Sequence, residues 1–95
     1  MTFVWDEAKR QANLSNKHRM DFADAQKVFA GITLTFEDDR FDYGEQHFIT
    51  IGLLNGEFMV IAHAEDASEN DLTRVISMRK ATKYEQQLFF RAFRN

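Results

Sequence analysis

The chain has 95 residues, no cysteine and a formal net charge of −3 at pH 7. This length predicts a single domain, residues 1–95, with one modest core that draws on ten Phe residues. Without cysteine there are no disulfides, zinc–thiolate sites or thiol nucleophiles. No segment approaches the roughly 20 apolar residues of a membrane span, and the first residues lack signal-peptide features. We therefore expect a cytoplasmic protein that has no membrane partner.

The charge is distributed unevenly along the chain. Residues 1–73 hold six Lys or Arg and fourteen Asp or Glu, a net charge of −8. Residues 74–95 hold six basic residues and one acidic residue, a net charge of +5. The basic end can either meet phosphate despite the acidic total, or pair with the acidic body.

The amino-terminal part predicts a short strand over residues 3–5 and a helix over residues 6–17. Asp6 can cap this helix. Lys9, Asn13 and Lys17 are four residues apart, so they form one polar line along it.

A second helix is expected to begin at Asp21, which can cap it. Phe22, Ala25 and Phe29 have the spacing of a buried helical stripe. Gly31 is the expected end of this helix.

The strongest local signal is Asn55-Gly56, a two-residue turn that requires positive φ at both positions. It predicts a hairpin of strands over residues 45–54 and 57–64, and an alternating strand over residues 33–37 precedes it. Residues that face each other across the turn share a face of the sheet. One face is nearly all apolar and is expected to pack under helices: His47, Ile49, Ile51, Leu53, Phe58, Val60, Ala62 and Ala64. The other is mixed and is expected to be open over part of its length: Phe48, Thr50, Gly52, Glu57, Met59, Ile61 and His63.

The carboxy-terminal part predicts an acidic loop over residues 65–71, a strand over residues 73–78 and a last helix. Thr82 and Glu85 have the spacing of a capping box, and the helix should continue to about Phe93. Its expected inner stripe is Ala81, Tyr84, Leu88 and Ala92. The remaining aromatic residues form either a wide core face or a partner-binding surface; they are Phe89, Phe90 and Phe93.

The element order β-αα-ββββ-α predicts an α+β domain with helices packed on one face of a largely antiparallel sheet. The motifs within this order resemble the BrnT family, the toxin half of bacterial type II toxin–antitoxin pairs. The residues that carry the resemblance are Trp5-Asp6-Glu7-Ala8-Lys9, Asn13, Lys17-His18, Gly44-Glu45, Arg74-Val75-Ile76-Ser77-Met78-Arg79-Lys80-Ala81 and Glu85.

This resemblance implies a RelE-like fold and an endoribonuclease that blocks translation. It also implies a partner, a BrnA-like antitoxin that is similar to ribbon-helix-helix proteins. The complex would bind operator DNA through this antitoxin only, not through the chain itself. No cofactor or metal is expected, because His18, His47 and His63 lie on different predicted elements without metal-ligand spacing. A second function stays open, namely a catalytically degenerate interaction domain that acts only through its antitoxin complex.

Metal-independent RNA cleavage needs a base for the 2′-hydroxyl, an acid for the leaving oxygen and fixed cations on the phosphorane. The resemblance implies Arg79 and Arg74 as cations, and a regular strand would point them to opposite faces with Arg79 toward His63. His63 lies on the more open predicted face, so it is the candidate acid or base, with a His satisfied at a strand end as the alternative. Glu45 is a candidate base, or it orients Arg74 or Arg40, and we favour orientation.

The remaining candidates are secondary. His47 falls on the apolar face and is expected to be structural, although family members commonly carry Arg at this position. The candidate RNA contacts outside the catalytic set are Lys80, Lys83, Lys9 and Lys17.

Overall fold

The computed structural model describes residues 1–16, 19–66 and 71–94. Lys17 and His18 lie outside these residues, as do residues 67–70 of the predicted acidic loop. The elements follow the predicted order, with a short 3₁₀ helix before the second α-helix. They are β1 (Thr2–Trp5), α1 (Glu7–Ser15), η1 (Phe22–Asp24), α2 (Ala25–Phe29), β2 (Thr33–Glu37), β3 (His47–Leu54), β4 (Glu57–Asp66), β5 (Leu72–Lys80) and α3 (Lys83–Phe93).

The strands form one sheet in the order β1-β5-β4-β3-β2. β2 to β5 pair antiparallel with their sequence neighbours, whereas β1 joins the far edge parallel to β5. The predicted hairpin is confirmed: Asn55 and Gly56 have φ values of 51° and 82°, and Phe48 lies opposite His63. An α+β fold with a mostly antiparallel sheet is therefore correct.

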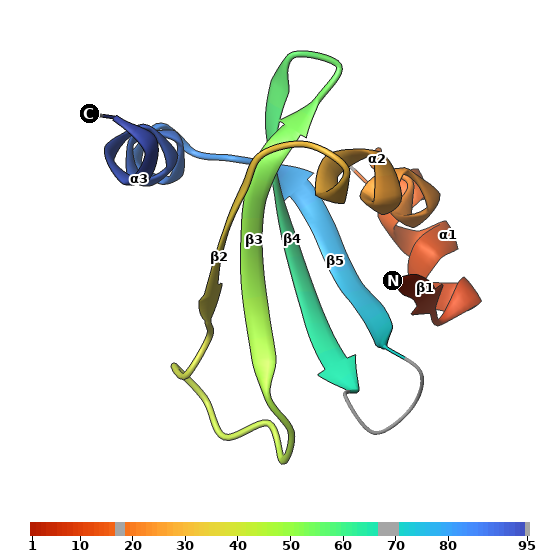
Figure 1. The fold of residues 1–95 in the computed structure, drawn as a ribbon. Helices are drawn as coiled ribbons and strands as arrows, with labels where there is room; N and C mark the ends of the chain where they lie inside the picture. The colour runs from red at the N-terminus through yellow and green to blue at the C-terminus, as the bar shows by residue number, and fades with distance from the viewer. Residues whose placement is uncertain (17–18, 67–70, 95) are drawn as a thin grey trace.

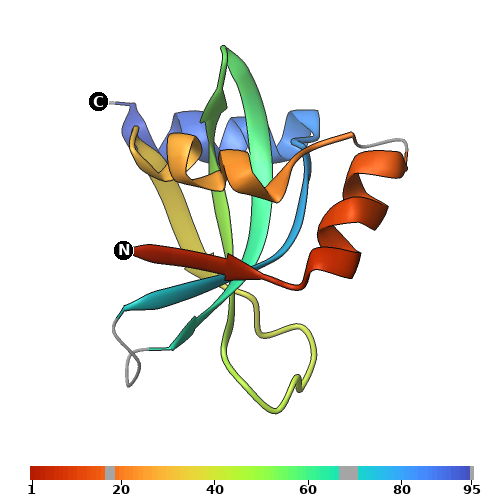
Figure 2. The ribbon, with the colours of Figure 1, turned by 90° about the vertical axis from the view of Figure 1, so that its right-hand side faces the viewer.

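The expectation that all helices cover one face of the sheet is wrong. α1, η1 and α2 lie on one side and α3 lies on the other, as Figures 1 and 2 show. Phe22, Ala25 and Val28 pack with Ile61 on the first side, which we call the α2 face. On the opposite side, the α3 face, Phe89 packs against the strands. Both faces of the hairpin carry apolar side chains, so each face is stabilised by its own helix layer.

A bulge in the sheet places the β5 side chains differently from a regular strand. Ala62 of β4 lies opposite Ser77, but His63 lies opposite Val75, so Ile76 is the extra residue. An extra residue reverses the alternation that follows it. Arg74 and Arg79 therefore lie on the same face, the α3 face, opposite Ala64 and Val60 respectively. The expectation that they point to opposite faces is wrong for this reason.

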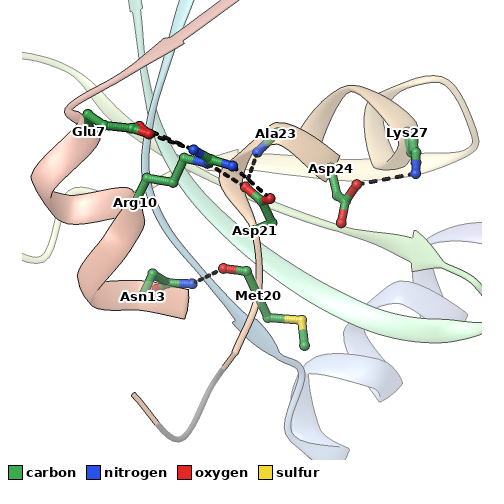
Figure 3. Close-up of polar contacts among 8 residues, drawn as sticks. All are labelled: Glu7, Arg10, Asn13, Met20, Asp21, Ala23, Asp24 and Lys27. Atoms are coloured by element: carbon green, nitrogen blue, oxygen red, sulfur yellow. Dashed lines mark hydrogen bonds and ion pairs between the residues drawn. The ribbon is translucent and has the colours of Figure 1, made fainter. Parts of the chain in front are cut away.

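Polar contacts join α1 to η1 (Figure 3). The predicted Asp6 cap is confirmed, since its side chain accepts a hydrogen bond from the Lys9 backbone at 3.1 Å. The Arg10 guanidinium makes two hydrogen bonds, of 2.7 and 3.0 Å, to Asp21. Asn13 is buried and donates to the backbone oxygens of Met20 and Met78. Asn13 therefore has a structural role. Of the other two residues of the predicted polar line, Lys9 is exposed and Lys17 lies outside the described residues.

The last helix begins with the predicted capping box. The Glu85 backbone donates to the Thr82 side chain at 3.2 Å, and the Thr82 backbone donates to the Glu85 carboxylate at 2.8 Å. The predicted inner stripe is correct for Ala81 and Leu88, which pack against the core, and wrong for Tyr84 and Ala92, which are exposed. Phe89 is the buried residue of the helix. Phe89 contacts Phe58 with a centroid distance of 5.1 Å, and this contact sets the rotation of the helix.

Candidate functional site

The open part of the α3 face lies beyond the area that α3 covers. α3 packs on β3 and β2 through Phe89, near Ile51 and Val60. At the strand ends farther from the hairpin, Arg74 and His47 flank Ala64 across three neighbouring strands. The Arg74 side chain is 48% exposed there, whereas that of His47 is 14% exposed and Ala64 is buried. The candidate site is built at this end.

Glu45 lies between the two basic side chains of this end. Its Oε1 atom contacts the Arg74 guanidinium and lies 3.0 Å from Nε2 of His47. The hydrogen bond from His47, and then that from Arg74, lower the pKa of Glu45. Glu45 therefore pairs with both Arg74 and His47, and its role in orienting Arg74 stays a prediction. The Tyr43 ring stacks on that imidazole, with centroids 3.8 Å apart.

Arg79 is held by Glu85 of the last helix. Nη1 and Nη2 of Arg79 each donate to one carboxylate oxygen at 2.8 Å. These bonds lower the pKa of Glu85 to about 2 and raise that of Arg79, while the positive charge of Arg40 opposes the latter change. Within the described residues, no acceptor bonds to Nε of Arg79. The side of the guanidinium that carries Nε–H therefore stays free to donate.

The loop between β2 and β3, which extends below the sheet in Figure 1, adds a third arginine, Arg40. Asp38 is buried and accepts from Nε and Nη2 of Arg40 at 2.8 and 3.0 Å. The Arg40 guanidinium lowers the pKa of Asp38 to about 2. Asp38 also accepts from the Tyr43 hydroxyl at 3.1 Å, and its backbone donates to the His47 carbonyl at 2.8 Å. Tyr43 thus links the Arg40 loop to the His47 end of the site.

Arg40 and Arg79 line a common hollow of about 360 Å³. Ile49 lies in its lining, two residues after His47 on the same face of β3, so the backbones of these two residues are about 7 Å apart along the strand. The full lining is Phe36, Glu37, Asp38, Asp39, Arg40, Ile49, Arg79, Tyr84, Glu85 and Leu88.

The bulge therefore brings Arg79, Arg74 and Glu45 to one face, but it does not bring His63 there. His63 is 1% exposed on the α2 face, so the expectation that it lies on an open surface is wrong. Its Nε2 lies 2.7 Å from the Thr50 hydroxyl and its Nδ1 lies 2.8 Å from Glu65, while Phe29 packs against the ring. Burial lowers the pKa of His63, against the opposing charge of Glu65. Nε2 has a hydrogen-bond partner, whereas Nδ1 lies close to Glu65 without hydrogen-bond geometry. His63 is therefore a buried His of the core, and the alternative of a His satisfied at a strand end holds for Nε2 alone.

The lysines and aromatic residues predicted to bind RNA or a partner lie elsewhere. Lys80 pairs with Glu57 at 3.3 Å near the hairpin, and Lys9 and Lys83 are exposed. Phe89 belongs to the core. Phe90 and Phe93 remain exposed on α3 and line a second hollow with Arg91 and Arg94.

Sequence reasoning missed Asp38, Arg40 and Tyr43 as one unit and assigned His47 a structural role. The local spacing of these three loop residues was visible, but their contact with His47 depends on how the loop folds back. In the described parts of the chain, no cluster of three or more His, Asp or Glu side chains is able to hold a metal ion. No helix in those same parts is long and apolar enough to cross a membrane.

Comparison with known proteins identifies the family. The sequence model of BrnT, described as the ribonuclease toxin of type II toxin–antitoxin systems, matches residues 5–85. The chain belongs to the BrnT family. The match includes Glu45, Arg74, Arg79 and Glu85, and it ends before the exposed Phe90 and Phe93 of α3. No curated protein and no solved structure matches the chain. The RelE-like assignment of the fold stays a prediction.

Proposed function

We propose that this BrnT protein is a metal-independent endoribonuclease that cleaves RNA on the open part of the α3 face. The RNA 2′-hydroxyl would attack the adjacent phosphorus and expel the 5′-oxygen, which leaves a 2′,3′-cyclic phosphate. This reaction needs a proton acceptor, a proton donor and fixed positive charge on the phosphorane. The observation that carries the proposal is that Arg79 and Arg40 line one hollow on the face of the sheet where His47 pairs with Glu45.

Arg79 is the proposed cation for the transition state. Glu85 occupies the Nη1–Nη2 end of its guanidinium, and the Nε–Nη2 edge can still make a bidentate contact with phosphate. The carboxylate therefore fixes the plane of the guanidinium without using all of its donors. A preorganised cation of this kind stabilises developing charge without reorganising during the reaction.

His47 is the proposed acid–base group, in place of His63. Imidazole is the side chain best suited to exchange a proton near neutral pH, and its contact with Glu45 orients the ring as a carboxylate does in other acid–base pairs. Arg74, bound to Glu45, would keep this carboxylate ionised and in place. The lysines would contribute only peripheral phosphate contacts; they are Lys9, Lys17, Lys80 and Lys83.

The proposed partner is a BrnA-like antitoxin that binds α3 through Phe90 and Phe93. Both rings are exposed beside the hollow that Gln87, Arg91 and Arg94 also line. The complex would reach operator DNA only through the antitoxin, in the cytoplasm, and the free toxin would inhibit translation. Phe90→Ala should weaken antitoxin binding by about 1–3 kcal/mol, as truncation of an aromatic anchor does. Unchanged affinity in both Phe90→Ala and Phe93→Ala would exclude this surface.

The alternative is a catalytically degenerate domain that acts only through its antitoxin complex. The pairing of every site arginine with a carboxylate favours it, as does His47 where the family commonly has Arg.

The deciding experiment incubates purified, antitoxin-free chain with single-stranded RNA in the presence and absence of EDTA. We expect cleavage in both, with 2′,3′-cyclic phosphate ends, and growth arrest when the chain is expressed alone. Intact RNA and normal growth with soluble protein would support the degenerate domain, whereas cleavage that EDTA abolishes would end the metal-independent mechanism.

A further inference from the structure

The hollow beside Arg79 has an aromatic and apolar lining that the cleavage chemistry does not use. Phe36 of β2 is 40% exposed, and Tyr84 in the first turn of α3 is 64% exposed. Both side chains line the hollow, together with Ile49 and Leu88. Phosphate and 2′-hydroxyl groups gain nothing from such a surface, whereas a flat apolar group does.

We propose that this hollow binds a nucleobase of single-stranded RNA, next to the phosphate that Arg79 contacts. The inference rests on the proposed function, because it places the substrate of that same site. Every nucleobase has a π face that stacks on aromatic side chains, and proteins that bind single strands combine such rings with cationic groups. Phe36 and Tyr84 supply the rings here, and Arg40 and Arg79 supply the cations.

The charges around the hollow favour a base over a second phosphate. Arg40 and Arg79 line it, but so do four acidic residues, Glu37, Asp38, Asp39 and Glu85. These carboxylates would repel a phosphate held deep in the hollow. The edges of bases carry N–H donors, which carboxylates accept. A base inside the hollow can donate hydrogen bonds to the carboxylates while its phosphate contacts the arginines.

More aromatic side chains continue from the hollow toward His47. Arg40 lies over the exposed Phe41 ring at 5.7 Å, Phe41 contacts Tyr43, and Tyr43 stacks on His47. A single strand can place successive bases on such a path. A duplex cannot, because its bases are already stacked on each other, so the hollow selects unpaired RNA.

The test measures binding to wild-type protein with an RNA that cannot be cleaved. A single-stranded 2′-O-methyl oligoribonucleotide of about ten nucleotides has no 2′-hydroxyl nucleophile and covers a typical single-strand site. Phe36→Ala and Tyr84→Ala should each weaken its binding by about 5- to 100-fold, the range found when a stacking ring is removed. Ile32→Ala is the control, because Ile32 is an exposed apolar side chain outside the hollow, and it should change affinity less than twofold. Circular dichroism checks folding, and Tyr84→Ala decides the matter if Phe36→Ala fails to fold.

A scan with abasic nucleotides identifies the base in the hollow. At one position, removal of the base should weaken binding of wild-type protein as much as Phe36→Ala does, and the two changes together should cost no more than either alone. Wild-type affinity in both hollow variants, with RNA cleavage retained, would overturn this inference and leave the proposed function intact. If neither variant affects the oligonucleotide but both lose antitoxin affinity, the hollow belongs to the antitoxin. If wild-type protein neither cleaves RNA nor binds the oligonucleotide, the proposed function fails and this inference fails with it.

Discussion

Glu85→Gln separates the charge of Glu85 from its role in the capping box. Gln can still accept from the Thr82 backbone, because the capping box tolerates either residue, but it no longer pairs with Arg79 as an ion. The drop in the pKa of Glu85 from 4.5 to about 2 corresponds to roughly 3 kcal/mol. The Arg79 side chain is 38% exposed, so solvent screening reduces this to about 1–2 kcal/mol. Glu85→Gln should lower the free energy of unfolding at pH 7 by that amount.

The lowered pKa of Glu85 also predicts how the stability difference between wild type and Glu85→Gln depends on pH. A carboxylate with a depressed pKa contributes its stability fully above its unfolded value, here 4.5, and loses it as the pH falls toward about 2. Urea unfolding should therefore show a difference between wild type and Glu85→Gln that is largest above pH 5 and shrinks toward pH 2. Glu57→Gln is the control, since Glu57 pairs with Lys80 in an exposed ion pair and should change stability by less than about 0.5 kcal/mol.

The same variant should also act on catalysis. Without the ion pair the Arg79 guanidinium is less constrained, so kcat should fall by about 10- to 100-fold. KM should not rise, because removal of a carboxylate does not weaken attraction for RNA. A difference in stability that is equal at all pH values, together with unchanged kcat, would refute the role of Glu85 as the residue that positions Arg79.

Three further predictions concern the site and the fold. Arg79→Ala should lower the cleavage rate by about 10²–10³ with the circular dichroism spectrum unchanged, and Arg79→Lys should recover only part of it; full activity in Arg79→Ala would move the site elsewhere. His47→Gln should flatten one limb of the pH–rate profile, whereas His63→Gln should leave the profile unchanged. Because the pKa of His63 is lowered in the folded protein, its contribution to stability falls as the pH drops below 6.5. Urea unfolding between pH 7 and 5 should show this decline in wild type and less of it in His63→Gln. Gly56→Val should lower the free energy of unfolding by about 1–3 kcal/mol, because φ is +82° there, and an unchanged melting temperature would contradict this.

Local signals in the sequence predicted most of the elements. The Asn55-Gly56 turn needs no tertiary contact to be favourable, and it fixed the register of β3 and β4. The Asp6 cap and the Thr82–Glu85 capping box are also short-range interactions, and both are present. The order of elements followed from these signals.

The faces of the sheet could not be predicted in the same way. The mixed face containing Thr50 and His63 looked partly open, but the hydroxyl and the imidazole bond to each other and the face is buried under η1 and α2. The extra residue Ile76 has no sequence signal, yet it decides where Arg74 and Arg79 point. The family pattern therefore singled out Arg74, Arg79 and Glu45, whereas the part of Arg40, Tyr43 and His47 in the candidate site was missed. The placement of Arg74 and Arg79 on one face required the bulge.

The ion pairs of the site reconcile an acidic chain with phosphate chemistry. A net charge of −3 gives little long-range attraction for RNA, so binding must depend on local contacts. Carboxylates that hold Arg40 and Arg79 reduce their net charge, but each guanidinium has five donors and its carboxylate uses only one edge. The remaining edge is fixed in direction, and a fixed donor stabilises a transition state better than a mobile one of the same charge. The proposed site therefore gains geometric precision at the expense of electrostatic steering.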